Sequence, residues 1–197
     1  MLIVASLVMA GCASFPGNNL PKQGYGNLVS AQPKAVIDYD VTFIGQSGEQ
    51  MYTASHLFAE QVKSVFEKSN VFASHNLNGK GAPVHLSVTM KNKGNLTAAK
   101  LAGIVAGLTL TIVPVCGTDE YELTVDIGSG DKVFKRYAYN DHVTTWFQLF
   151  LIFASPSHKP GEVTHEVVEN MLLHFLHDAQ ADGVLSITNT DVSDKRL

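Results

Sequence analysis

Apolar and polar residues alternate strictly in two segments of the chain, 84–90 and 121–127. Strict alternation is typical of a strand that packs one face on a core and leaves the other face to solvent. Gly128-Ser129-Gly130-Asp131 follows the second segment and predicts a hairpin turn into a further strand over 132–140. Residues 35–44 are rich in β-branched and aromatic side chains and predict another strand.

Two segments, 54–69 and 162–178, repeat apolar residues with a helical period of about 3.6 residues. Short strands are expected at 71–73 and 184–187. Strands therefore outnumber helices, and the order of elements predicts a single domain over residues 34–197. Its fold class is α+β, with a mostly antiparallel or mixed sheet and helices packed on one face.

Two apolar stretches, 101–116 and 146–154, interrupt this pattern and contain no charged residue. Each is shorter than the roughly 20 residues of a membrane-spanning helix. Each can be a core element, a surface for a partner or a second copy, or a segment that dips into a membrane. We expect Leu108, Leu110 and Ile112 in the core. Trp146, Phe147 and Phe150 are the candidate contacts with a membrane or partner, with Trp146 and Phe147 on the surface.

Because both stretches flank the hairpin between 121 and 140, they are expected at the same end of the sheet. Together they would then form one apolar platform. Exposed apolar area of that size marks an interaction surface.

The first eleven residues carry no charged side chain and end in Met9-Ala10-Gly11-Cys12. Small residues before a cysteine at the end of a short apolar run resemble the lipobox of bacterial lipoproteins. The resemblance implies a signal peptide over 1–11 and lipidation of Cys12, which becomes the first mature residue. Ala13 stands where the retention signal of that family has Asp, which implies the outer membrane and a periplasm-facing domain.

Residues 12–33 are rich in Gly, Pro and Asn and predict a flexible tether behind the lipid. Cys116 then has no partner for a disulfide and is expected as a small buried apolar residue.

Two further resemblances agree with this location in the cell envelope. The order of elements is similar to the periplasmic α/β domain of curli-secretion channel lipoproteins and of the Tol-system propeller protein. The run from Gly107 to Pro156, with TTWFQLFLIF inside it, resembles a family of small Gram-negative lipoproteins. Neither resemblance implies an activity or site residues.

The charge composition bears on the possible partners of the chain. The net charge is −4, and the sequence has no basic run, which argues against nucleic acid as a partner. Charged residues make up 16% of the chain, below the roughly 25% of ordinary soluble domains, which agrees with contact to lipid or a partner.

Candidate catalytic and metal-binding residues are few. His165-Glu166-Val167-Val168-Glu169 begins like a zinc-protease helix but has Glu where the second His is required. His174 and His177 are one helical turn apart and could share a metal. Asp38 and Asp40 share one strand face, where carboxylates are usually solvated, and Asp141-His142 forms a small polar cluster. We expect no metal, no cofactor and no enzymatic activity.

The sequence therefore predicts a non-enzymatic outer-membrane lipoprotein, an accessory, assembly or scaffolding component of the cell envelope. Its partners would be the membrane, through the lipid anchor, and an envelope protein or a second copy of the chain. The alternative is a periplasmic lipoprotein that binds a small apolar or lipid ligand between sheet and helices.

Overall fold

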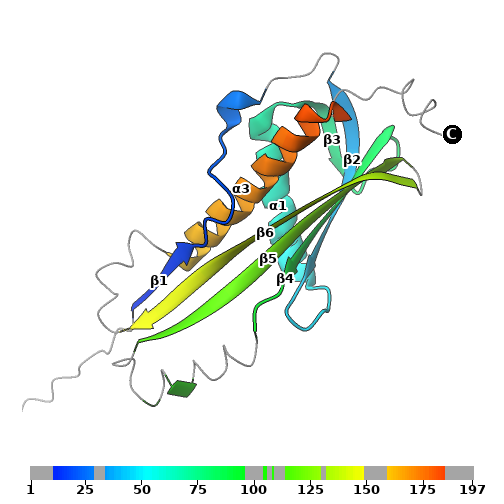
Figure 1. Ribbon diagram of the computed structural model, residues 1–197. Coiled ribbons are helices and arrows are strands. Elements are labelled where there is room, and N and C mark those ends of the chain that lie inside the picture. The colour runs from blue at the N-terminus through cyan, green and yellow to red at the C-terminus, as the bar shows by residue number, and fades with distance from the viewer. Residues whose placement is uncertain are drawn as a thin grey trace, which may run out of the picture.

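A mixed sheet and two long helices make up the computed structural model (Figure 1), which describes residues 11–28, 34–95, 104, 105, 108, 114–129, 132–148 and 159–184. The strands are β1 (Gly11–Pro16), β2 (Ala35–Ile44), β3 (Phe72–Leu77), β4 (Val84–Asn92), β5 (Val115–Ser129) and β6 (Lys132–Gln148). The helices are α1 (Tyr52–Ser69) and α3 (Pro160–Ala181), and a 3-10 turn, η1, covers Tyr25–Asn27.

The strand order is β1-β6-β5-β4-β2-β3. The pairs β1/β6, β6/β5 and β5/β4 are antiparallel, whereas β4/β2 and β2/β3 are parallel. Both helices cover the same face of this sheet (Figure 1). The predicted α+β class, with a mixed sheet and helices on one face, is confirmed.

The alternating pattern explains why the helices lie on that face. The apolar residues of β4 and β5 are buried beneath the helices, and the register pairs Leu86 with Ile127 and Val88 with Val125. Each fully buried aliphatic side chain stabilises the fold by roughly 1.5–3 kcal/mol. The helices contribute the other half of the core with Val62, Val65, Phe66, Met171, Leu172, Phe175 and Leu176.

Two tyrosines of β6 contact α3 and the residue that follows it through ring packing and hydrogen bonds. Tyr137 packs edge-on against Phe175 at 5.6 Å, and its hydroxyl donates to Asp182 at 2.7 Å. The hydroxyl of Tyr139 donates to Asp178 at 2.6 Å. Burial, together with these carboxylate acceptors, raises the pKa of both phenols.

Strands β5 and β6 are longer than the pattern predicts. Strand β5 begins at Val115 and strand β6 ends at Gln148, so that the second apolar stretch starts inside β6. The pairing of β4 with β5 ends at Tyr121, whereas β5 and β6 stay paired as far as Val115 and Phe147. The two strands therefore form a ribbon that runs beyond β4 at the end where β1 joins β6 (Figure 1).

Asp38 is not the solvated carboxylate that the sequence predicts. Its side chain is 2% exposed, although it lies on the sheet face opposite the helices. Chain 78–83 leaves β3, crosses β2 and enters β4 on its other side, and Asp38 accepts backbone N–H groups from Gly81 and Ala82, both at 2.6 Å. Asn76 donates to the same carboxylate at 3.1 Å. A carboxylate is buried here because it satisfies the donors of the crossing loop.

We expect Asp38→Asn to lower the free energy of unfolding by about 2 kcal/mol at pH 7, because an amide cannot accept all three donors. The hydrogen bonds, first that from Ala82, lower the pKa of Asp38 in the folded state. The wild-type advantage is therefore present above the unfolded pKa and is lost as pH falls through the folded pKa. Urea unfolding at pH 7 and near pH 3 measures both effects.

Asp126→Asn is the matched control, because Asp126 forms an exposed ion pair with Arg136 on the same sheet face. Such pairs contribute about 0–1 kcal/mol. Equal losses for the two variants would contradict the role given to Asp38.

Candidate functional site

At the free end of the β5–β6 ribbon, the candidate lipidation site and the candidate aromatic contacts lie close together, although they are far apart in the sequence. Phe147 of β6 is paired with Val115 on one side and with Cys12 on the other. Trp146 lies between Cys116 and Ala13 in the same way. The candidate lipidation site therefore lies beside the candidate aromatic contacts.

Trp146 and Phe147 are 40% and 41% exposed, as the sequence predicts. Adjacent residues of a strand point to opposite faces, so the two aromatic side chains flank the ribbon on both sides. Phe15 of β1 is also exposed. We call this group, Cys12, Phe15, Cys116, Trp146 and Phe147, the aromatic end. The third candidate contact, Phe150, lies outside the described residues.

The described residues of the first apolar stretch are exposed, except Val115, which is half-buried. Ile104, Val105 and Leu108 are 58%, 41% and 81% exposed, so the prediction that Leu108 is a core residue is wrong. Leu110 and Ile112 lie outside the described residues.

Cys116 is exposed and not buried as predicted. It lies on the part of the ribbon that extends past β4, where β5 pairs with β6 alone, and on the face opposite the helices.

Both apolar stretches leave the sheet at the same end. The first connects the end of β4 to the start of β5, and the second connects the end of β6 to the start of α3. The expected shared end is confirmed for the residues that flank the stretches. Among the described residues, no helix has the length and hydrophobicity needed to cross a membrane.

The segment that follows Cys12 is not a loose tether in its described part. Gly11–Pro16 forms β1, and residues 17–28, which we call the strap, run along α3 (Figure 1). The prediction of a tether rested on Gly, Pro and Asn content. That composition also suits a segment whose backbone groups bond to side chains of the domain.

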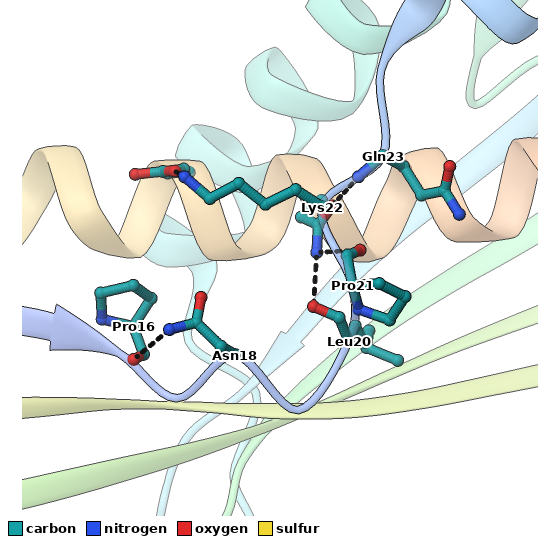
Figure 2. A network of polar contacts seen from close by, with 8 residues as sticks. Pro16, Asn18, Leu20, Pro21, Lys22 and Gln23 are labelled. Carbon is teal, nitrogen blue, oxygen red and sulfur yellow. Dashed lines mark hydrogen bonds and ion pairs between the residues drawn. The ribbon is translucent and has the colours of Figure 1, made fainter.

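Asn170 of α3 is the centre of the strap contacts, and Figure 2 labels the strap residues that it bonds, Leu20, Pro21 and Gln23. Its side-chain oxygen accepts the backbone N–H of Gln23 at 2.8 Å, and its nitrogen donates to the carbonyls of Leu20 and Pro21 at 3.5 and 3.3 Å. Lys22 forms an ion pair with Glu166, and the hydroxyl of Tyr25 donates to Glu169. Burial, with this carboxylate acceptor, raises the pKa of Tyr25.

The candidate metal ligands of α3 take part in the same contacts. The Nε2 atom of His174 bonds to the carbonyl of Pro21 at 2.8 Å, and that of His177 bonds to the carbonyl of Gly24 at 3.0 Å. His165 lies near Glu169, with 4.0 Å between Nδ1 and Oε2. Within the described ranges, no three His, Cys, Asp or Glu side chains gather in a geometry for a metal ion.

Asp141 and Asp40, two acidic residues that the sequence singled out, are also hydrogen-bonded. Asp141, which is 3% exposed, accepts the backbone N–H groups of Asn19 and His142 and so holds the start of the strap. Asp40 accepts both from Ser87 at 2.8 Å and from His85. A serine and a histidine that share one carboxylate in this way do not form a nucleophile–base pair, because the serine is not bonded to the histidine.

Asn170→Ala is expected to loosen the strap and to leave the core intact. Loss of its hydrogen bonds costs about 1–2 kcal/mol, which would make amide exchange in residues 17–28 about tenfold faster. Hydrogen–deuterium exchange measures this directly. Glu162→Ala, an exposed change on the same helix, is the control. Unchanged exchange in the strap of Asn170→Ala would contradict this assignment.

Comparison with known proteins gives structural neighbours only. No family model matches the chain, and no curated protein matches it. The chain is similar to a crystal structure of a homologue of a neuraminyllactose-binding hemagglutinin from Helicobacter pylori, with a TM-score of 0.44 and 7% identity over 89% of this chain and 92% of that one.

It is also similar to a DUF330 protein from Xanthomonas campestris (TM-score 0.37, 12% identity, 86% of this chain and 90% of that one). A third similar structure is the PelC dodecamer from Paraburkholderia phytofirmans (TM-score 0.31, 10% identity, 82% of this chain and 98% of that one). At these identities and TM-scores the likeness does not assign a function.

Proposed function

We propose that this chain is an outer-membrane lipoprotein, anchored by lipid on Cys12, that faces the periplasm and acts as a non-enzymatic accessory or assembly component of the cell envelope. The observation that carries the proposal is the pairing of Cys12 with Phe147 in the sheet. A lipid on Cys12 would emerge beside the exposed aromatic residues that a bilayer interface favours.

Removal of a signal peptide over 1–11 would cost β1 only Gly11, and the pairs from Cys12 to Pro16 would remain. The strap then continues along α3. The mature domain would therefore lie directly at the membrane, because the strand that carries the lipid is part of its sheet.

Attachment through acyl chains can be strengthened by a direct contact of the protein with the bilayer. Trp146 and Phe147 supply an apolar one, since burial of each ring removes apolar area from water at about 25 cal/mol per Å². Ile104 and Leu108 of the first apolar stretch are exposed as well. The part of the surface that does not enter lipid is available to an envelope protein or a second copy of the chain.

The surroundings of the candidate catalytic residues support a non-enzymatic role. Glu166, Glu169, His174 and His177 all bond to the strap. The polar atoms of these side chains therefore hold the strap on α3.

Metabolic labelling with a palmitate analogue tests the anchor. The wild-type chain should be labelled and should sediment with membranes, and Cys12→Ala should lose both properties. Cys116→Ala is the matched control, since Cys116 is the other cysteine of the chain and is exposed at the same end. Retained labelling of Cys12→Ala, or loss of labelling in Cys116→Ala alone, would contradict the proposal.

A further inference from the structure

The two helices leave an open groove between their N-terminal halves, above the ends of β2 and β4. Its volume is about 700 Å³, within the range of roughly 300–1,000 Å³ that is typical of ligand pockets. Its apolar lining comes from both helices and three strands: Phe43, Leu57, Phe58, Met90, Tyr121 and Val168. We propose that this groove binds one acyl chain of a zwitterionic membrane phospholipid.

The lining favours a hydrocarbon chain over a peptide. Gln61 donates its side-chain nitrogen to the carbonyl of His165 at 2.7 Å. The hydroxyl of Tyr121 is hydrogen-bonded to Thr164, and burial is the main reason that its pKa is raised to about 12. These groups are already paired, whereas a peptide backbone needs a partner for each N–H and C=O group that it buries.

The charge at the groove selects among lipids. Glu60 and His165 are the ionisable side chains of the lining besides Tyr121, and Glu60 is exposed. The Glu60 carboxylate attracts the ammonium group of phosphatidylethanolamine and repels the carboxylate of a free fatty acid. The chemistry therefore favours a phospholipid with a cationic group on its head.

The position of the groove fits this source. The groove is lined by the first halves of α1 and α3 and by residues near the ends of β2 and β4, toward the end of the sheet from which the ribbon continues to the aromatic end. Leu57, which is 68% exposed, lies at the groove and offers apolar surface to an entering chain. The inference rests on the proposed function to the extent that the anchor brings this end of the domain to lipid.

Photo-crosslinking tests the groove in the full lipidated chain. The protein is reconstituted in vesicles of phosphatidylethanolamine and phosphatidylglycerol that contain a trace of phosphatidylethanolamine with a diazirine halfway along one acyl chain. Mass spectrometry of the irradiated protein should find the probe on peptides covering 54–64 and 160–168. Leu57→Asp should reduce this yield about tenfold, since a carboxylate is strongly disfavoured beside hydrocarbon.

Leu77→Asp, a matched change at an exposed residue of the edge strand β3, should leave the yield unchanged. Glu60→Lys should shift labelling from the phosphatidylethanolamine probe toward a phosphatidylglycerol probe with the same diazirine. Vesicle flotation of each variant reports membrane attachment separately. A chain that floats but has no probe on the groove peptides would overturn this inference and leave the proposed function standing.

Two other results would also overturn it. Equal groove labelling by a diazirine palmitate would make a free fatty acid the ligand. If Leu57→Asp instead abolished amine-crosslinked dimers in the same vesicles, a second copy of the chain would cover the groove.

Discussion

Phe147→Asp is expected to withdraw the aromatic end from the bilayer without disturbing the fold. The chain contains one tryptophan, Trp146, so its fluorescence reports this end alone. In vesicles that contain brominated lipid, emission from the lipidated wild-type chain should be quenched. Loss of the Phe147 ring, worth about 1.5–3 kcal/mol of burial, should lower the inserted fraction about tenfold or more.

The control is Tyr52→Asp, a change at an 80% exposed aromatic residue at the start of α1, which should leave quenching unchanged. Trp146→Asp completes the test by thermal unfolding. Because Trp146 is partly exposed, the melting temperature of this variant should stay within about 2 °C of the wild-type value. Outright unfolding of Trp146→Asp would show that Trp146 is a core residue and would contradict the membrane contact.

Leu123→Asp is expected to have the largest effect on stability. Leu123 is fully buried in β5, opposite Met90 and Tyr139 and beneath the helices. An unpaired carboxylate there costs several kcal/mol, against a total stability of about 5–15 kcal/mol. The variant should be unfolded or should melt far below the wild-type protein, as circular dichroism can measure.

Val133→Asp places the same side chain on the same sheet at a residue that is 59% exposed. It should change the free energy of unfolding by no more than about 0.5 kcal/mol. Equal stability of the two variants would contradict the core described above.

The sequence predicts those elements whose pattern is local. Segments 84–90 and 121–127 are strands because their alternation places every second side chain in the core, and 54–69 and 162–178 are helices because of their period. The fold class follows from the order of these elements. The bounds of β5 and β6 do not, since their outer residues pair with each other and with β1, a strand that the sequence did not predict.

The contacts that the sequence did not reveal are all long-range. Asp38 is buried because a loop forty residues further along the chain crosses it. The strap is held by side chains of α3 about 150 residues away. Two of them, His174 and His177, resembled a metal site in the sequence. A pairing over such a separation leaves no periodic signal in either segment. One signal was available, since a helix with His and Asn on its polar flank can bond a passing backbone.

The candidate site was predicted in part. The exposure of Trp146 and Phe147 could be inferred from their place at the edge of an aromatic-rich apolar stretch. The shared end of the two apolar stretches could be inferred from the position of the hairpin between them. Leu108 and Cys116 were misplaced because apolar character alone does not distinguish a core from an interface. The pairing of Cys12 with Phe147 could not be predicted, because residues 12–33 read as a tether and not as part of the sheet.

The most direct test of the central claim is the mass of the N-terminal peptide of the chain isolated from cell envelopes. A peptide that begins at Cys12 and carries acyl chains should be recovered from the outer-membrane fraction. A peptide that contains residues 1–11, or one that begins at Cys12 without lipid, would contradict the claim.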